Sequence, residues 1–583
     1  MKSYIFLILI ILSEAFFRIY GLNWDQGNHL HPDERAIVMF TTPLQFPKNI
    51  SEFMSPQSTW NPHFFAYGSF PIYLLKIIGN ILSIFNPSFS TYDQINILGR
   101  AMSAFFDIGT ILVLFFLTKK LFHKKIALIA AFFYSISVLP IQLSHFYAVD
   151  TLLTFFILST LYQLIRFYEK PTLVKAVSIG ILFGLSLATK ISAIVLLSSI
   201  GVALAVDFFL IFLKQPHRPY IWFPHMPKFL KRLFIDGFII AVVTIITFVF
   251  FESYAIIDFQ TFLRQNLEQQ HMTYDAFTFP YTLQYVGIIP YWYELKNIFL
   301  WGLGPILATL AFLGTIYLTL KTSHHLYSSS EEQSDESRSF SSRQARTIIL
   351  LSFFWVYFAI VGHFAIGFMR YMLPLYPLLC LFAAVLAYKL LLNLKSYFLN
   401  HKSIFIILNS LFIILILVWP LSFMHIYTQP NTRVSASNWI NQNIPPGKTL
   451  AVEHWDDGLP LFGVEKYRIV TLPLYESDTP QKWAGINQQL AQTDYIIIAS
   501  NRLYVPLMKM TDCKKLPPGR CYVQTTQYYN NLFGGSLGFQ KVAEFSIYPS
   551  LILNHSSFII NDSSADESFT VYDHPKVMIF KKN

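Results

Sequence analysis

Two adjacent acids, Asp33 and Glu34, stand in the stretch His31-Pro32-Asp33-Glu34, directly after the first membrane-length apolar segment of the chain. That segment, residues 3–20, is long enough to cross a bilayer, which needs roughly 20 apolar residues. The acids are therefore expected at the membrane–water boundary. Carboxylates are costly there unless they are solvated or take part in chemistry. A boundary site suits a reaction between a lipid-borne substrate and a water-borne one.

Further polar side chains fall at the ends of later apolar segments, on what we expect to be the same membrane face. They are Arg100, His145, Asp150, Lys190, Arg370 and Tyr371. Cationic side chains stabilise the negative charge that develops on a departing phosphate. The candidate contacts to a donor phosphate are therefore Arg100, Lys190, Arg370 and Tyr371.

A carboxylate within hydrogen-bond reach of an acceptor hydroxyl is a candidate general base. Asp33 is our first choice for that role, and Glu34, Asp150 and His145 complete the candidate catalytic set. No step of such a reaction requires a metal or another cofactor, so we expect none.

Each of these residues also has a purely structural interpretation. Pro32-Asp33-Glu34 is typical of a helix start, where acids in the first turn are favoured by the helix dipole. Asp150 is also placed to open a helix, and Lys190 and Arg370 suit snorkelling anchors. A lone His145 is more often structural than catalytic. The gathering of acids and bases at one face nevertheless favours a site.

The composition is that of a polytopic membrane protein. The chain has 583 residues, of which 54% are hydrophobic and 13% charged, and its mean hydropathy is +0.45. Soluble domains carry about 25% charged residues. The net charge of +10 comes from basic residues in short loops. This pattern indicates membrane topology and does not predict a nucleic-acid partner.

Eleven apolar segments are predicted to span the membrane. They cover residues 3–20, 95–117, 126–143, 147–166, 175–189, 191–213, 233–253, 298–320, 347–365, 371–394 and 403–425. Lysine and arginine concentrate in alternate loops, which by the positive-inside rule puts the N-terminus in the cytoplasm. Residues 67–85 are apolar but contain Pro71, Lys76 and Gly79. We expect them to form an interfacial helix along the outer face.

The predicted organisation has two parts. Residues 1–425 form a transmembrane catalytic domain, which includes a first extracytoplasmic loop at 21–94 and a Ser-rich, disordered cytoplasmic loop at 322–346. Residues 426–583 form an extracytoplasmic α/β or α+β domain, with a helix at 433–443 and a buried strand at 495–499.

Two cysteines of this second part, Cys513 and Cys521, are candidates for a disulfide, because an extracytoplasmic compartment is oxidising. The alternative is a pair of free thiols.

A family resemblance is carried by short motifs in a fixed order along the membrane half. They are His31-Pro32-Asp33-Glu34, Tyr67-Gly68-Ser69-Phe70-Pro71, Leu98-Gly99-Arg100, Ser144-His145-Phe146 with Asp150, Ala188-Thr189-Lys190, and Arg370-Tyr371-Met372-Leu373-Pro374. In this order the chain resembles the protein O-mannosyltransferase-like, phospholipid carrier-dependent glycosyltransferases of the GT-C fold. The resemblance covers about 425 residues.

The resemblance implies an inverting transferase that uses a dolichyl- or undecaprenyl-phosphate sugar outside the cytoplasm, at the plasma membrane. By analogy, the acid matching Asp33 acts as base and the residue matching Arg100 helps to hold the phosphate.

Candidate acceptor contacts are weaker. Glu453-His454-Trp455-Asp456 is partly similar to the Trp-Trp-Asp motif with which oligosaccharyltransferases hold an acceptor hydroxyl, although His454 replaces the first tryptophan. Trp455 and Asp456 are therefore candidates. Gln284 and Tyr285, in the outside segment 254–297, are also candidates, but interfacial anchoring is the favoured interpretation of such aromatics.

The leading hypothesis is transfer of a single sugar from a polyprenyl-phosphate donor to an acceptor hydroxyl on a protein, glycolipid or glycan. The alternative is a lipid-linked sugar transporter or flippase, which predicts inverted repeats and ionisable residues at mid-membrane depth. A non-catalytic scaffold that displays the C-terminal domain gives no reason for Asp33, Arg100 and Asp150 to lie at one face.

Overall fold

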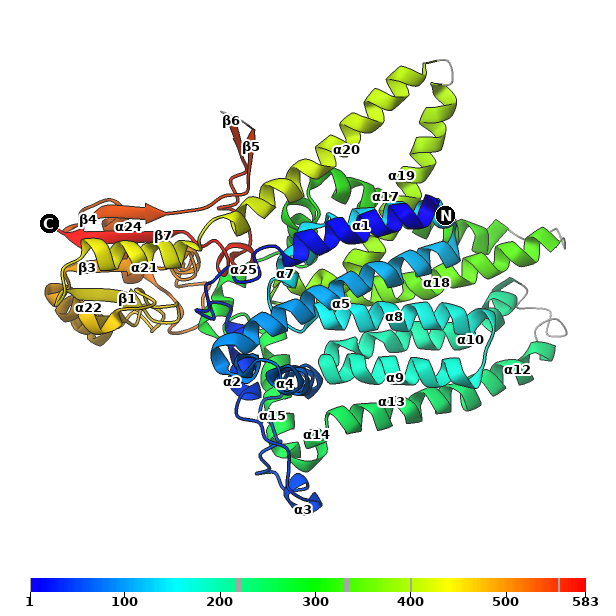
Figure 1. The fold of residues 1–583 in the computed structure, drawn as a ribbon, viewed down its shortest axis with the longest axis horizontal. Coiled ribbons are helices and arrows are strands. Elements are labelled where there is room, and N and C mark those ends of the chain that lie inside the picture. The colour runs from blue at the N-terminus through cyan, green and yellow to red at the C-terminus, as the bar shows by residue number, and fades with distance from the viewer. Residues whose placement is uncertain (1, 215–222, 329–334, 399–400, 554–555) are drawn as a thin grey trace.

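A computed structural model describes residues 2–214, 223–328, 335–398, 401–553 and 556–583. A bundle of long helices is followed by a smaller region built on a β-sheet, and the sheet lies beyond one end of the bundle (Figure 1). This arrangement confirms the predicted class, a polytopic α-helical membrane protein with a small C-terminal sheet domain.

Within the described residues, eight helices are long and apolar enough to cross a bilayer, or nine if one bent pair is counted as a single span. The eight ranges are Tyr92–Leu121, Asp150–Glu169, Ile191–Leu210, Phe223–Phe251, Pro305–His324, Arg343–Val361, Met369–Tyr397 and Lys402–Asn443. The helices that make them up are α5 (Tyr92–Leu121), α8 (Asp150–Glu169), α10 (Leu196–Lys214), α12 (Met226–Lys231), α13 (Gly237–Phe251), α17 (Pro305–Ser328), α18 (Asp335–Val361), α19 (Tyr376–Tyr397) and α20 (Lys402–Met424).

The three remaining predicted spans are helical but irregular. Helix α9 (Leu173–Thr189) has only 17 residues, and α6 (Lys124–Ser135) meets α7 (Val138–Ser144) at a bend of 59°. Helix α1 (Lys2–Ile19) carries charged residues within its apolar sequence. Among the described residues, length and composition alone thus identify eight or nine of the eleven predicted spans.

The charges of α1 are satisfied inside the bundle. The Arg18 Nε lies 2.8 Å from Asp107 Oδ2 of α5 and 3.3 Å from Glu14 Oε1. The hydroxyl of Tyr134 donates to the other oxygen of Asp107, at 2.6 Å. All four side chains are fully buried. Because a buried charge is tolerated only when it is paired, this cluster fixes α1 against α5 and α6.

The predicted disordered loop at 322–346 is helical wherever it is described. Residues 322–328 continue α17 and residues 335–346 begin α18, while 329–334 lie outside the described residues. The two helices are tied together because Gln344 Nε2 donates to the Thr322 carbonyl at 3.0 Å. Polar side chains here pair across two helices, which composition alone does not reveal.

The predicted interfacial segment forms α4 (Ser69–Ser83). Helix α4 is seen end-on in Figure 1 while the long helices run across the view, so it lies across the bundle at the end nearer the sheet. It packs beside α2 (Pro32–Thr41), and Lys76 Nζ donates to the Thr42 carbonyl at 2.9 Å. Lys76, which interrupts the apolar sequence of α4, therefore stabilises the contact of α4 with α2.

The C-terminal region contains a five-stranded sheet in the order β2-β1-β3-β7-β4. Strand β1 pairs in parallel with β2 and β3, whereas β7 pairs antiparallel with β3 and β4. The elements are α21 (Thr432–Asn443), β1 (Thr449–Glu453), β2 (Arg468–Leu472), α22 (Pro480–Gln492), β3 (Tyr495–Ile498), α24 (Val523–Phe533), β4 (Phe539–Phe545) and β7 (Val577–Lys582). The predicted helix and buried strand are confirmed as α21 and β3, and Cys513 forms the predicted disulfide with Cys521.

A segment before β7 returns to the bundle and attaches the sheet region to it. Phe569, in α25 (Glu567–Thr570), packs against Phe423 and Trp419 of α20. Gln142 of α7 donates to the Phe569 carbonyl at 2.7 Å. The residues that flank this contact are therefore held at the boundary between the two regions.

Candidate functional site

A cavity of about 910 Å³ lies where the bundle meets the sheet region. Its walls come from α2, the loop before α4, the junction after α9, the helix α15 (Phe259–Tyr274), the turn η7 (Met369–Leu375) and the loop after β1. Asp33, Tyr67, Lys190, Arg370 and Tyr371 are among the residues that line it.

Asp33 reaches the cavity because it stands in the first turn of α2. His31 caps this helix by accepting from the Glu34 backbone N–H at 3.4 Å, and Pro32 occupies the first helical position. Burial lowers the pKa of His31 well below its usual value, so its imidazole is neutral and can accept. The helix-start interpretation of this motif is therefore correct, and it is compatible with a site.

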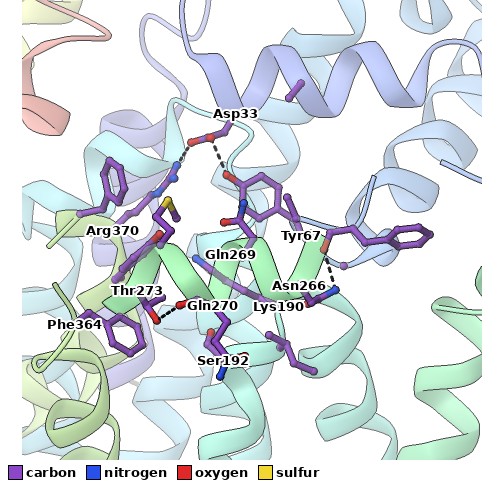
Figure 2. A pocket seen from close by; sticks show the side chains of 18 of the residues that line it. Asp33, Tyr67, Lys190, Ser192, Asn266, Gln269, Gln270, Thr273, Phe364 and Arg370 are labelled. Carbon is purple, nitrogen blue, oxygen red and sulfur yellow. Dashed lines mark hydrogen bonds and ion pairs between the residues drawn. The ribbon is translucent and has the colours of Figure 1, made fainter. Parts of the chain in front are cut away.

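The Asp33 carboxylate has two partners in the cavity. Tyr67 donates its hydroxyl to Asp33 Oδ1 at 2.7 Å, and Arg370 Nη1 pairs with Asp33 Oδ2 (Figure 2). The Asp33 side chain is 20% exposed, so the carboxylate is accessible to a substrate.

Tyr67 is held in place by a close approach of backbones. Gly68 donates its N–H to the Thr189 carbonyl at 3.1 Å, and a Cβ on Gly68 would lie only 1.8 Å from the Ala188 carbonyl oxygen. Only glycine fits this contact. The loop that carries Tyr67 is thereby fixed to the end of α9, next to Lys190.

Lys190 and Arg370 supply the positive charge. Lys190 Nζ lies 2.9 Å from Asp150 Oδ1 and 4.6 Å from the centre of the Tyr371 ring. Arg370 Nε is 4.0 Å from Asp150 Oδ2, and this buried nitrogen has no hydrogen-bond partner within the described residues. Both cations line the cavity, where the Lys190 side chain is 16% exposed and the Arg370 side chain is 11% exposed. Asp150 itself is 2% exposed and lies behind them as their counter-ion, not at the cavity surface.

Arg100 is placed differently from its prediction. A guanidinium has five N–H donors, and those of Arg100 bond to the two carboxylates of Asp25 and Glu34 and to the Leu22 carbonyl at 2.6–2.9 Å. Arg100 is fully buried and is not among the residues that line the cavity. The predicted phosphate contact is therefore corrected: no donor of Arg100 remains for a ligand.

Glu34 and His145 are likewise structural in this geometry. Glu34 is fully buried and also accepts from the Tyr147 backbone N–H at 2.9 Å. Both ring nitrogens of His145 are within 2.9 Å of backbone carbonyls, and the ring stacks on Tyr427 at 3.8 Å. Neither residue lines the cavity, so the structure does not support catalytic roles for them.

Of the four candidate acceptor residues, two line the cavity and two do not. Trp455 and Asp456 line the cavity, and Trp455 is 45% exposed with a positive φ of 73°. Asp456 is already paired with Arg433 Nη2 at 2.8 Å. Tyr285 is buried, and Gln284 donates to Glu567 at 2.6 Å. Neither lines the cavity, so Gln284 contributes only by orienting Glu567, which does.

Residues 94–226 match the sequence profile of the dolichyl-phosphate-mannose-protein mannosyltransferase family. This match confirms the resemblance that the motifs indicated. Over this stretch the chain is similar to that family, and its long apolar helices are those of a membrane protein. Among curated proteins, none matches it significantly.

Solved structures with an overall likeness come from three organisms. The Archaeoglobus fulgidus oligosaccharyltransferase AglB, in complex with an inhibitory peptide and a dolichol-phosphate, is 15% identical with a TM-score of 0.49, over 100% of this chain and 88% of that chain. Cupriavidus metallidurans ArnT bound to undecaprenyl phosphate is 12% identical with a TM-score of 0.45, over 88% and 95%. The S. cerevisiae Pmt1-Pmt2 complex bound to the sugar donor is 14% identical with a TM-score of 0.33, over 45% and 34%.

Several cavity residues were not anticipated from the sequence. On the sheet side they are Asp457, Arg502, Glu567 and Tyr572, and on the helical side they are Arg35 of α2 and polar residues of α15. Arg35 Nη1 pairs with Asp457 at 3.0 Å, and Arg502 Nε pairs with Glu567 at 2.7 Å. The first pair joins residues 422 positions apart, and the second joins residues 65 positions apart. The sequence signal that was available is the amide-rich run in 265–270.

The cavity combines two environments. Its polar part includes the Asp33 carboxylate and the cations of Lys190 and Arg370. Its apolar part includes Ile191, Ile194, Leu263 and Leu267, which are 42–53% exposed. Such a chamber suits a molecule with a charged head and an apolar chain.

Proposed function

We propose that this protein transfers a single sugar from a polyprenyl-phosphate donor to an acceptor hydroxyl, with inversion at the anomeric carbon and with Asp33 as the base. The observation that carries the proposal is the convergence of Asp33, Lys190 and Arg370 on one amphipathic cavity. Together these residues provide a base and two phosphate contacts within one chamber.

In the proposed reaction the donor phosphate binds at Lys190 and Arg370, and its lipid chain leaves along Ile191, Ile194 and Leu263. Arg370 now pairs with Asp33, so a bound phosphate would compete for this guanidinium. Loss of that pair would free the Asp33 carboxylate to accept a proton.

The bond changes follow a single displacement. The acceptor hydroxyl gives its proton to Asp33 while its oxygen attacks the anomeric carbon. The bond from that carbon to the phosphate oxygen breaks, and its electron pair leaves with the polyprenyl phosphate. Lys190 and Arg370 stabilise the charge that appears on the departing phosphate. One displacement inverts the anomeric configuration.

The acceptor would approach from the sheet side, where Trp455 and Asp456 form part of the wall. A protein, a glycolipid and a glycan all present hydroxyl groups that fit this proposal. We further propose that the cavity faces the outside of the plasma membrane, with the N-terminus in the cytoplasm, as the distribution of basic residues predicts. No other cofactor is part of the proposed reaction.

The test is a transfer assay with purified protein, polyprenyl phosphates that carry different radiolabelled sugars, and acceptors of the three classes. We expect a labelled product of inverted configuration. Lys190→Gln and Arg370→Gln should each lower transfer by about 10- to 100-fold, because each removes a charge-assisted contact to phosphate. Asp93→Asn, an exposed acid outside the cavity, is the matched control. Folded wild-type protein that transfers sugar from none of the donors would refute the proposal.

A further inference from the structure

The helix α15 forms one wall of the cavity and is unusual in how it divides its polar residues. Asn266, Gln269, Gln270 and Thr273 line the cavity, whereas the charged residues Arg264 and Glu268 do not. Positions 266, 269, 270 and 273 follow the three- and four-residue spacing of one helix face. The cavity thus meets a neutral amide and hydroxyl surface on this side.

The amides of this helix fall into two groups. Gln265 bonds the loop before α4: its Oε1 accepts from the Phe65 backbone N–H at 2.6 Å, and its Nε2 donates to the His63 carbonyl at 3.0 Å. Asn266 donates to the Phe262 carbonyl at 2.9 Å. In contrast, the side-chain amides of Gln269 and Gln270 make no hydrogen bond within the described part of the chain. The first group positions the helix, and the second is unused.

Both ends of the lining face are fixed. Gln265 holds the middle of α15 to residues 63–65, and the Thr273 carbonyl accepts from the Ala365 backbone N–H at 2.8 Å. In Figure 2 the Gln269 side chain extends from α15 toward Tyr67, the residue that contacts Asp33. The two free amides are therefore presented by a rigid element that faces the candidate base.

A carboxamide has two N–H donors and one acceptor oxygen, which matches the hydroxyl groups of a sugar. Apart from Asp33, which the proposed reaction uses as its base, the acids in the cavity are not available to a cationic sugar. Asp33, Asp456, Asp457 and Glu567 are each paired with an arginine. The fifth acid, Glu252, accepts from Ser69, and burial raises its pKa to about 8, so it is mostly protonated at pH 7.

We propose that Gln269 and Gln270 bind the hydroxyl groups of the donor's sugar and select an uncharged hexose or pentose. This inference rests on the proposed function, which it deepens by naming the class of sugar. In the proposed function the phosphate is held by Lys190 and Arg370, which come from elements other than α15, so the amides contribute to recognition of the sugar and not of the lipid phosphate.

The test compares two ligands: a polyprenyl phosphate that carries a neutral sugar, and the same polyprenyl phosphate without a sugar. In the full-length protein, Gln269→Leu and Gln270→Leu should each weaken binding of the sugar-bearing lipid by about 10-fold and change binding of the bare lipid by less than 2-fold. Gln260→Leu, an exposed position of α15 outside the cavity, should change neither. Equal effects on both ligands, or no effect on either, would overturn the inference.

The transfer assay separates this inference from the proposed function. If wild-type protein transfers sugar and the glutamine variants keep the wild-type KM for the donor, only the inference fails. If wild-type protein transfers no sugar, the proposed function fails, while the binding comparison still decides whether the amides contact sugar. A wild-type protein that uses an amino sugar donor in preference to neutral hexose and pentose donors would overturn the assignment of sugar class.

Discussion

Two arginine–carboxylate clusters lie at the same end of the bundle, and they differ in how completely the cation is used. All five donors of Arg100 bond to Asp25, Glu34 and Leu22, and the group is sealed from solvent. Arg370 pairs with Asp33 at the edge of a cavity and keeps its Nε without a hydrogen bond. The buried Arg100 cluster holds the fold together, whereas the Arg370 pair at the cavity is the one that we propose binds the donor phosphate.

The comparison is sharpest at two neighbouring residues. Asp33 and Glu34 are adjacent in α2, but helical geometry points them about 100° apart. Asp33 therefore reaches the cavity, while Glu34 enters the Arg100 cluster. Predictions that separate activity from stability test this division directly.

The largest expected effect is on activity. Asp33→Asn should lower sugar transfer by about 10³-fold, because a positioned base contributes 10²–10⁴-fold. The melting temperature in detergent should stay close to that of the wild type, since the asparagine still accepts from Tyr67. A variant with at least a tenth of the wild-type turnover would exclude Asp33 from the role of base.

The next largest effect is on stability. Arg100→Met should destabilise the protein by about 3–5 kcal/mol, because it leaves Asp25 and Glu34 buried without their partner. Thermal unfolding monitors this change, and Lys119→Met, at the exposed end of the same helix, is the control. The folded fraction should bind the donor with wild-type affinity. A selective loss of donor affinity with normal stability would restore the predicted phosphate role of Arg100.

His574, Asp573 and Asp562 form a second buried ionic cluster. This cluster predicts that the stability of the protein depends on pH. Burial by itself would lower the pKa of His574, but the carboxylates of Asp573 and Asp562, at 2.5 and 2.8 Å, outweigh it and raise the pKa to about 10. The folded pKa lies above the ordinary value of about 6.5. The stabilisation is therefore complete below about pH 6.5 and is lost as pH rises through 10.

His574→Gln tests this sign. It should destabilise the protein by about 2–3 kcal/mol at pH 6, because it removes two charge-assisted hydrogen bonds. The difference in melting temperature from the wild type should shrink as pH is raised toward 10. A difference that grows with pH would contradict the charged state assigned to His574.

The smallest expected effect comes from the Tyr67 hydroxyl, which donates to the Asp33 carboxylate. Tyr67→Phe removes the hydroxyl that donates to Asp33 and should lower kcat/KM by about 10-fold. Because the carboxylate loses a donor, protonation becomes easier, and the acid limb of the pH–rate profile should move to higher pH. Tyr73→Phe, which removes a hydroxyl bonded to the Trp60 carbonyl outside the cavity, should leave the profile unchanged.

Much of the fold could be predicted from local features of the sequence. Apolar segments of membrane length, the helix start at Pro32, the helix after Asn431 and the buried strand at Tyr495 depend on composition and spacing over a few residues. The same is true of the two cysteines, whose separation of eight residues suits a disulfide. The motif order also indicated the family before any geometry was known.

The site was only partly predictable. The sequence marks Arg100 and Arg370 equally, as basic residues at the ends of apolar segments, and it does not reveal that Glu14, Arg18 and Asp107 pair inside the bundle. The amides of α15 carried no sign of which face meets a cavity. These properties depend on contacts between segments far apart in the chain.

The sequence by itself determined that this protein is a membrane-spanning bundle with a small sheet region, because the hydrophobic effect and backbone preferences act on short stretches of chain. Only the tertiary structure decided which charged side chains pair with one another and which line a cavity where a substrate could bind. The reason is physical: an ionic group is satisfied by whatever lies within a few ångströms of it, and for Asp33 that partner is Arg370, 337 residues away.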